Sequence, residues 1–345
     1  MSAGQADYSA AGVDYQTLDA AKRLAMTKAL STSGLLAGRG GTALDASRGE
    51  PAFVFELAGQ TLAFVLEGLG TKSVIARQVF EELGVNRFAE VAYDTVAAIL
   101  NDLCCVGALP LVLNAYFATG ASEWYAQPER ITALLEGWER GCREAGCVWG
   151  GGESPSLAGL VDERDIELAG AAVGAVPQGH KPILGEELSP GDEIVLVASS
   201  GMHANGASLA RLLAARLDGG YAATLPSGVS LGEALLEPSR LYVPLIAALL
   251  ERQVPVTYFS HITGHGLLKL MRPARALTYR ISELPPVPEV LAFLVEQAKL
   301  DDPAAYSTFN MGSGYAVYCA AGAADTVLEL ASGLGLQALI AGRVE

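Results

Sequence analysis

The sequence is poor in cysteine, histidine and positive charge, and each shortage excludes a class of protein. Its five cysteines form no C-x-x-C pair, and an odd number is typical of buried thiols in a reducing compartment. Its four histidines lack the partner ligands of a zinc site. Lys and Arg number 23 against 38 Asp and Glu, so the net charge of −15 disfavours nucleic acid or an anionic membrane as partner.

Long hydrophobic runs are also lacking. The most apolar stretch, residues 91–113, is interrupted by Asp94, Asn101 and Asp102, so no membrane span is expected. The first sixteen residues are polar and contain no signal-peptide core. We therefore expect a cytoplasmic protein whose partners are small molecules rather than nucleic acid or membrane.

The composition is sufficient for two domains. Hydrophobic residues make up 51% of 345 residues, whereas single cores stop growing at about 250–300 residues. Residues 1–50 are interpreted as a flexible arm and glycine-rich loop, 51–176 as an N-terminal domain, and 177–345 as a C-terminal domain. The boundary is placed in the Pro- and Gly-rich segment 177–192. Strands and helices alternate without a repeat, which predicts an α+β fold.

Several elements are predicted from local patterns. Residues 52–57 and 61–66 are expected to form a β-hairpin, and residues 91–107 a helix. A second amphipathic helix is expected at 128–145, with Pro128 in its first turn and Gly146 just past its end.

The helix expected at 91–107 carries three polar residues among Ala, Val, Ile, Leu and Cys. Asp94, Asn101 and Asp102 are spaced i, i+7 and i+8, so they share one face. Buried carboxylates are costly unless a cation neutralises them, and oxygen ligands suit Mg²⁺ or Ca²⁺. Either this face binds a cation or it faces water, and the spacing leaves both open.

Two glycine-containing segments supply further carboxylates. EGLGTK (67–72) follows an expected strand, and its glycines allow the backbone to approach a phosphate beside Lys72. It is neither a Walker A loop nor a G-x-G-x-x-G motif. WGGGE (149–153) is similar, although its glycines would also suit a simple turn.

Three polar loops lie in the second half: SSGMHANG (199–206), SHITGHG (260–266) and TFNMGSG (308–314). The first lies between an expected strand and helix, so it offers hydroxyls and helix N-terminal amides to an anion. The alternative is an ordinary turn capped by Ser or Asn.

Taken in order, these segments resemble the phosphoribosylformylglycinamidine cyclo-ligase (aminoimidazole ribonucleotide synthetase) family over nearly the whole chain. LEGLGTK (66–72) is similar to the family's T-D-G-V-G-T-K, and the run from Tyr93 to Gly120 is similar to its I-D-x-V-A-M-x-V-N-D-L … A-T-G. The other matching segments are YSAAGVD (8–14), GGES (151–154), SSGMHANGASLAR (199–211), LLEPSRLYV (235–243), SHITGHG and TFNMGSG.

The resemblance implies a homodimer in which the mixed sheets of the N-terminal domains pair, with helices on one side of each sheet. It also implies a C-terminal mixed sheet flanked by helices, with ATP in a cleft between the domains. The implied reaction is the ATP-dependent ring closure of formylglycinamidine ribonucleotide to aminoimidazole ribonucleotide in purine biosynthesis. The formyl amide oxygen is phosphorylated, the amidine nitrogen attacks, and phosphate leaves.

Roles for individual residues follow from the same resemblance. Mg²⁺ would bind Glu67, Asp94, Asp102 and Glu153, with K⁺ open as a second cation. The catalytic residues would be His261, which polarises the amide or moves a proton, Lys72, which steadies the phosphoryl group, and Asp102. ATP would contact Gly68, Gly70, Thr71, Lys72, Asp94, Asn101, Thr119, Gly120, Gly151 and Gly152. The substrate would contact Ser200, Gly201, His203, Asn205, Gly206, Thr263 and Asn310.

Several positions depart from the family pattern, mostly on the substrate side. Glu67 and Asn114 replace aspartates, and Leu109 replaces an acidic residue. Residues 155–159 replace A-E-M-P-G, and His265 replaces the middle glycine of T-G-G-G. Two alternatives therefore remain: a divergent ATP-dependent paralogue that phosphorylates another amide or carboxylate, or an inactive nucleotide-binding homologue.

Overall fold

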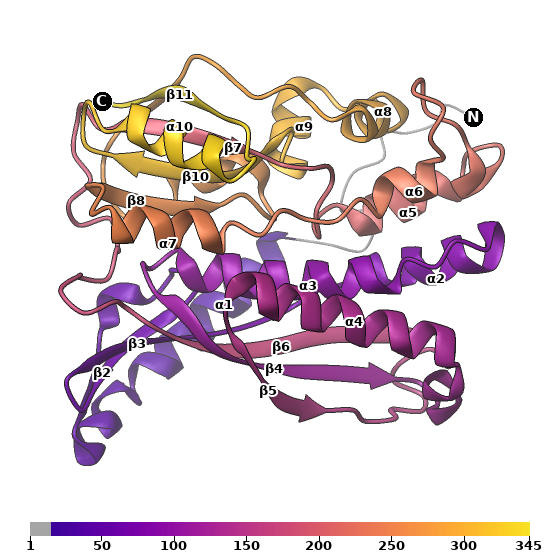
Figure 1. Cartoon of the computed structure of the whole chain (residues 1–345), viewed down its shortest axis with the longest axis horizontal. Helices are drawn as coiled ribbons and strands as arrows, with labels where there is room; N and C mark the ends of the chain where they lie inside the picture. The colour runs from indigo at the N-terminus through magenta and orange to yellow at the C-terminus, as the bar shows by residue number, and fades with distance from the viewer. Residues whose placement is uncertain (1–14) are drawn as a thin grey trace.

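The computed structural model describes residues 15–345, so the YSAAGVD segment lies outside the described part of the chain. Two α+β halves, each built on one sheet, lie one above the other, and the expected fold class is confirmed (Figure 1). The first half contains α1 (Tyr15–Leu30), η1 (Ser33–Arg39), β1 (Gly41–Ala43), η2 (Asp45–Ser47), β2 (Phe53–Leu57), β3 (Gln60–Gly68), α2 (Lys72–Leu83), α3 (Phe88–Cys104), β4 (Leu109–Thr119), η3 (Ser122–Ala126), α4 (Pro128–Ala145), β5 (Val148–Glu153) and β6 (Ile166–Ala175).

The first sheet has the strand order β1-β2-β3-β6-β4-β5. Only β4 and β5 pair in parallel, so the sheet is mixed, as expected. The predicted hairpin is β2–β3, and its turn residues Ala58 and Gly59 both have positive φ, which matches the twist of the strands. Helices α2, α3 and α4 lie on the face of this sheet that is turned toward the second half (Figure 1).

Close packing of α4 on α3 depends on two glycines in α4. A Cβ at Gly137 would lie 2.0 Å from the carbonyl oxygen of Ala89, and one at Gly141 would lie 2.8 Å from a methyl group of Val96. Larger residues there would force the helices apart. Helix α4 keeps its predicted bounds, and Gly146 ends it in the left-handed conformation.

The second half contains β7 (Glu193–Ala198), α5 (Ala207–Ala214), η4 (Gly220–Ala222), α6 (Leu231–Leu235), α7 (Val243–Glu251), β8 (Val256–His261), η5 (Gly266–Met271), β9 (Tyr279–Ile281), α8 (Glu289–Ala298), α9 (Asp302–Thr308), β10 (Ser313–Cys319), α10 (Ala324–Gly333) and β11 (Ala338–Val344). The loop 260–266 leads from the end of β8 into the 3₁₀ helix η5, and the loop 308–314 leads from α9 into β10.

The second sheet corrects one detail of the prediction. Its order is β8-β10-β7-β11-β9, and every neighbouring pair is antiparallel rather than mixed. The family resemblance implied a mixed sheet, and β7 and β8 do run in the same direction. Strand β10 lies between them, because two βαβ units interleave. The remaining strand, β9, extends the edge beside β11.

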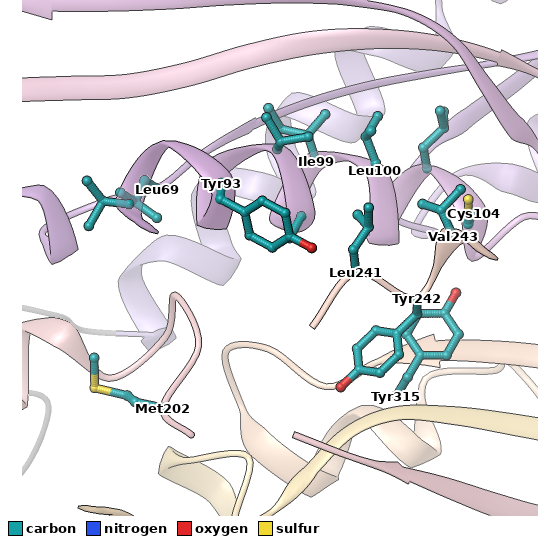
Figure 2. Packing of buried hydrophobic residues seen from close by; sticks show 14 of the residues in the cluster. Leu69, Tyr93, Ile99, Leu100, Cys104, Met202, Leu241, Tyr242, Val243 and Tyr315 are labelled. Carbon is teal, nitrogen blue, oxygen red and sulfur yellow. The ribbon is translucent and has the colours of Figure 1, made fainter. Parts of the chain in front are cut away.

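Helix α3 is the shared wall of both halves. Figure 2 shows Tyr93, Ile99, Leu100 and Cys104 along this helix, with Leu241, Tyr242, Val243 and Tyr315 of the second half opposite. All of these side chains belong to one buried cluster that crosses from one half to the other. Polar residues on α3 therefore lie at the junction of the halves.

Candidate functional site

A buried ion pair lies at the first half of α3. The Lys72 Nζ and Asp94 Oδ2 atoms are 2.5 Å apart, and both side chains are 0% exposed. The other oxygen, Asp94 Oδ1, accepts a hydrogen bond from the backbone N–H of Ser239 at 2.6 Å. Lys72 also donates to the carbonyl of Glu237 at 3.4 Å. Both Asp94 oxygens thus have protein partners, and the pair fixes the segment before α7 onto the first half.

Asn101, two turns further along α3, holds the same segment. Its amide nitrogen donates to the carbonyl of Arg240 at 2.9 Å, and its amide oxygen accepts from the N–H of Tyr242 at 2.8 Å. Asn101 is 1% exposed. An amide group that satisfies two buried backbone groups in this way contributes to the junction between the halves.

The last turn of α3 carries a different kind of contact. Asp102 Oδ1 lies 2.7 Å from His261 Nδ1 at the end of β8. A carboxylate can only accept, so Nδ1 carries the hydrogen and Nε2 is the free acceptor of the ring. Asp102 is 8% exposed, so unlike Asp94 it reaches the edge of the protein interior. This carboxylate–imidazole pair joins the two halves.

Glu67 and Lys269 complete a group of four ionisable side chains. The pKa of Glu67 is raised by burial and then by the nearby charge of Asp102, while Lys269 and His261 oppose the shift. Burial also lowers the pKa of Lys269, with Arg272 adding to the effect and Asp102 and Glu67 opposing it. We call Glu67, Asp102, His261 and Lys269 the junction group. Lys269 was missed by the sequence analysis, because an isolated lysine in η5 carries no motif.

Two residues expected beside the junction group lie elsewhere. Asp94 precedes Asp102 by eight residues on the same helix face, and a rise of 1.5 Å per residue separates them by about 12 Å along the axis. A shared face therefore did not mean a shared site.

Glu153 is separated from Glu67 across the sheet. It lies opposite Tyr116 of β4, Tyr116 lies opposite Ala169 of β6, and Ala169 lies opposite Gly68 of β3. Three strand spacings amount to about 14 Å. Glu153 belongs to the pleat row of Gly68, whereas Glu67 is one residue earlier and points to the opposite face. The structure thus places these two carboxylates on different sides of one sheet.

The expected phosphate loop borders a cavity at the start of α2. The cavity has a volume of about 410 Å³, and its wall includes Gly70, Thr71, Tyr116, Asp165 and Glu167. Burial raises the pKa of Glu167. The hydroxyl of Thr71 lies 3.0 Å from that of Ser208 in α5, so this loop contacts both halves.

Thr119 and Gly120 lie beneath the segment that follows β5. The backbone of Thr119 pairs with Pro155 and Leu157, and a Cβ at Gly120 would lie 2.3 Å from the carbonyl of Val161. Gly151 and Gly152 are exposed in β5, where Gly152 approaches the backbone of Ala115. These four expected ATP contacts therefore lie in or directly after the C-terminal ends of β4 and β5.

The loop 199–206 is held internally by Asn310. The side-chain amide of Asn310 donates to the carbonyls of Gly201 and Met202, and its oxygen accepts from the Ser199 hydroxyl and the Gly312 N–H. These four contacts occupy both N–H donors and both acceptor positions of the Asn310 side chain, and all four partners are protein atoms.

His203 also binds protein groups. Its Nε2 accepts from the N–H of Ser200 at 3.1 Å and from that of Arg240 at 3.4 Å. Burial lowers its pKa well below the usual value, with His261 and Lys72 adding to the effect, so the ring is neutral. The Ser200 hydroxyl donates to the carbonyl of Pro238. Gly206 caps α5 at a φ of 96°, where a Cβ would meet the Phe309 ring.

The loop 262–266 contains a strained position. His265 has a φ of 70°, a left-handed conformation that favours glycine, and it stands where the resemblance predicted glycine. The neighbouring Thr263 and Asn205 of the previous loop are half-buried. His265 thus keeps the left-handed backbone conformation that a glycine would adopt at this position, and it adds an imidazole side chain to the loop.

The carboxylates of the junction group fit a magnesium ion better than the four expected ligands do together. Burial and then the charge of Asp102 raise the pKa of Glu67, and a bound cation would relieve the repulsion between the two carboxylates. Both carboxylate oxygens of Asp94 already contact protein groups, Lys72 and the N–H of Ser239. Among residues 15–345, no group of three or more Asp, Glu, His or Cys side chains is arranged to hold a metal. If a magnesium ion binds here, Glu67 and Asp102 would be its protein ligands, and substrate oxygens and water would complete the shell.

The same described part of the chain contains no helix with the length and apolar character that crossing a membrane requires.

Comparison with known proteins was made for the whole chain. Family models described as "AIR synthase related protein, N-terminal domain" and "AIR synthase related protein, C-terminal domain" match residues 49–176 and 189–345. A phosphoribosylformylglycinamidine cyclo-ligase of Lachnospira eligens is 31% identical over 347 residues, covering 98% of this chain and 97% of that protein. One of Methanobrevibacter smithii is 33% identical over 285 residues, covering 81% and 79%.

The fold is also found among solved structures. The hydrogenase maturation protein HypE, solved in complex with ATP, matches with a TM-score of 0.57 at 19% identity, covering 84% of this chain and 78% of that one. At this identity the likeness shows a common fold.

Proposed function

The chain belongs to the AIR synthase related family, the family of phosphoribosylformylglycinamidine cyclo-ligase, and from this premise we propose that it is an ATP-dependent cyclo-ligase. Its substrate would be formylglycinamidine ribonucleotide and its product aminoimidazole ribonucleotide. ATP phosphorylates the formyl amide oxygen, the amidine nitrogen attacks that carbon, and phosphate leaves as the ring closes.

The observation that carries this proposal is the junction group. Phosphorylation of an amide oxygen needs countercharge for the phosphates and a group that polarises or deprotonates the amide. Lys269 supplies positive charge, and Glu67 and Asp102 supply oxygen ligands for a cation. These groups meet where the halves join, next to the helix that fixes one half on the other.

His261 is the proposed proton-transfer group. Asp102 holds its Nδ1–H at 2.7 Å, which fixes the tautomer and the ring orientation. Nε2 is then the nitrogen that would accept or return a proton at the amide or amidine. The ring is 4% exposed, so water competes weakly for it until substrate arrives.

Magnesium would be held by Glu67 and Asp102 and would, when bound, neutralise charge on the ATP phosphates. Lys72 and Asp94 were expected to contact ATP or magnesium directly. Because they bind each other, we propose an indirect role for both. Their proposed role is to hold α2 and the segment 237–239 in place, so that Gly70 and Thr71 form one wall of the nucleotide cleft.

A homodimer is proposed from the open face of the first sheet. Apolar side chains are exposed on this face, which is opposite to the helices, at Phe64 (43%), Leu66 (71%), Val112 (38%) and Val148 (62%). Contiguous apolar surface of this kind marks a protein interface. Pairing of two such faces would bury it. It would also cover Glu153, which shares the face, so that Glu153 would lie at the interface.

A divergent paralogue is the second candidate, favoured by the loop at His265. His265 adds a side chain at a left-handed position, four residues after His261, where the family pattern has glycine. Glu67, longer by one methylene than the expected aspartate, changes the metal side as well. A related amide or carboxylate would then be the phosphoryl acceptor.

The test is to incubate the purified protein with formylglycinamidine ribonucleotide, Mg²⁺ and ATP, and to measure all products. We expect aminoimidazole ribonucleotide, ADP and phosphate in equal amounts. ADP formed without ring product would exclude the cyclo-ligase and favour the paralogue. ATP binding with no turnover of this substrate or of other amides and carboxylates would favour an inactive homologue.

A further inference from the structure

The C-terminal end of α4 brings two cysteines together. Gly146 takes the left-handed conformation after the helix, and its N–H binds the carbonyl of Arg143. The N–H of Cys147 binds the carbonyl of Cys142 at 3.0 Å. This six-to-one hydrogen bond is that of a Schellman motif, in which the side chains at the two bonded positions make contact. Here the contacting side chains are both thiols.

The two thiols are chemically unequal. Cys142 donates a hydrogen bond to the sulfur of Cys147, which lowers the pKa of Cys147 and raises that of Cys142. Cys142 is 3% exposed, whereas Cys147 is half-buried. A more acidic, accessible thiol beside a second thiol is the arrangement of a redox-active pair.

We propose that Cys142 and Cys147 form a reversible oxidation site that closes to a disulfide in the presence of a peroxide. The Cys147 thiolate attacks one peroxide oxygen, the O–O bond breaks, and the sulfenic acid forms with release of water. The sulfur of Cys142 then attacks the sulfenic sulfur, and hydroxide leaves with the Cys142 proton as a second water. Two thiols and one hydrogen peroxide thus become one disulfide and two waters.

The other three cysteines are poorer candidates. Cys104, Cys105 and Cys319 are all 0% exposed, and burial raises the pKa of each thiol. The Cys105 thiol donates to the Asn101 carbonyl, and its sulfur lies 3.4 Å from the Tyr315 hydroxyl in the core. The charge of Cys147 adds to the raised pKa of Cys104, so Cys104 is the competing partner that the experiment must separate.

The position of the pair connects it to β5. Strand β5 begins at Val148, directly after Cys147, and carries Gly151, Gly152 and Glu153. A disulfide would fix the start of this strand to the last turn of α4. Trp149 and Trp138 flank the pair, with ring centroids 6.2 Å apart, and Trp138 is one turn before Cys142. Because two of the three tryptophans of the chain lie close to the pair in sequence, tryptophan fluorescence is a local reporter of its oxidation.

The experiment treats the full-length reduced protein with stoichiometric hydrogen peroxide, blocks free thiols in denaturant, and maps the peptides by mass spectrometry. We expect two of the five thiols to disappear and a Cys142–Cys147 disulfide that dithiothreitol reverses. Tryptophan fluorescence should fall on oxidation and recover on reduction. Cys147→Ser should abolish the fluorescence change, while the matched control Cys319→Ser should retain it.

Peptide mapping of the unmutated protein keeps the test independent of whether the variants fold. Five free thiols after peroxide treatment would overturn the proposal. A disulfide between Cys104 and Cys147 would overturn the pairing, as would a fluorescence change that persists in Cys147→Ser. None of these readouts depends on the ligase reaction, so failure here would leave the proposed function untouched.

Discussion

Helix α3 carries two aspartates on one face, and their surroundings give them different properties. Asp94 is 0% exposed, and its oxygens bind Lys72 and the N–H of Ser239. Asp102 binds His261 and lies near Glu67 and Lys269 at the edge of the interior. Both residues are aspartates on the same side of one helix. Burial and partners make Asp94 part of the contact that holds the halves together, and they leave Asp102 in contact with His261, where we propose that it takes part in the reaction.

The difference teaches that an acidic stripe at a domain junction does not have to be a single metal site. In a fully buried ion pair, the attraction between two close charges offsets the free energy lost on desolvation. Removing one partner leaves the other charge buried and unpaired. A carboxylate with one protein contact and some exposure keeps an oxygen for a ligand. The two aspartates should therefore respond oppositely to mutation, in stability and in turnover.

The largest expected effect is on the buried pair. Lys72→Ala would leave Asp94 charged and unpaired, which should lower the free energy of unfolding by about 3–5 kcal/mol. Urea denaturation followed by circular dichroism measures this change. Lys269→Ala is the matched control, because Lys269 is only half-buried and forms no fully buried ion pair with any residue of 15–345, so it should shift the midpoint far less.

A Lys72→Met/Asp94→Leu double variant sharpens the comparison. It should regain part of the stability that Lys72→Ala loses, since no unpaired charge remains and only the N–H of Ser239 loses its acceptor. An unfolding midpoint of Lys72→Ala equal to that of the parent would refute the structural role of the pair.

The next effect is on turnover. Asp102→Asn should lower kcat for ring closure by roughly 10²–10⁴-fold, because the amide no longer holds the His261 tautomer or a cation. Steady-state kinetics at saturating ATP gives this value. His261→Asn should lower kcat to a similar degree, and the double variant should be little worse than either, since the two residues act as a unit. Additive losses would show that they act separately.

A smaller effect concerns assembly. Leu66→Glu would place a charge on the open face of the first sheet. In the proposed dimer this face meets the same face of the partner, so two like charges would approach each other and association should weaken about 100-fold. Light scattering coupled to size-exclusion chromatography measures the mass. Val229→Glu, at an apolar position that is 43% exposed in a loop of the second half, is the control and should leave the mass unchanged. A monomeric parent would contradict the dimer outright.

The smallest effect is the pH dependence of stability from Glu67. Its folded-state pKa is raised, so the native state binds the proton more tightly than the unfolded state. The stability tied to this group is therefore greatest below the unfolded pKa and falls as pH rises through the folded pKa. Glu67→Gln should flatten this decline on the acid side of neutrality, as measured by urea unfolding at a series of pH values. A steeper decline in the variant would reverse the sign of the assignment.

Local patterns were sufficient for most of the fold. The hairpin β2–β3 and the helix α4 were predicted because a turn, a proline at the first turn and a glycine at the end are encoded in adjacent residues. The antiparallel second sheet was not, since inserting β10 between β7 and β8 joins residues more than a hundred positions apart. Hydrophobic periodicity along the sequence does not predict which strand lies between two others in a sheet.

The candidate site was predicted only as far as helical phase and sequence motifs allow. Asp102 and His261 were both singled out, and the structure brings them into contact. The helical face of Asp94 was correct, but its partners Lys72 and Ser239 depend on how α2 and the segment before α7 pack on α3. Lys269 had no signal at all, because a lysine gains a role here from its neighbours in space.

The most direct test compares two isosteric changes on the same helix, Asp94→Asn and Asp102→Asn, each measured for urea stability and for ATP-dependent ring closure. We predict that Asp94→Asn loses stability while the folded fraction still turns over, and that Asp102→Asn keeps a near-parental midpoint while ring closure falls at least about 100-fold. If Asp94→Asn instead abolished turnover at unchanged stability, or Asp102→Asn closed the ring at the parental rate, the division of α3 into a structural and a reactive end would be wrong.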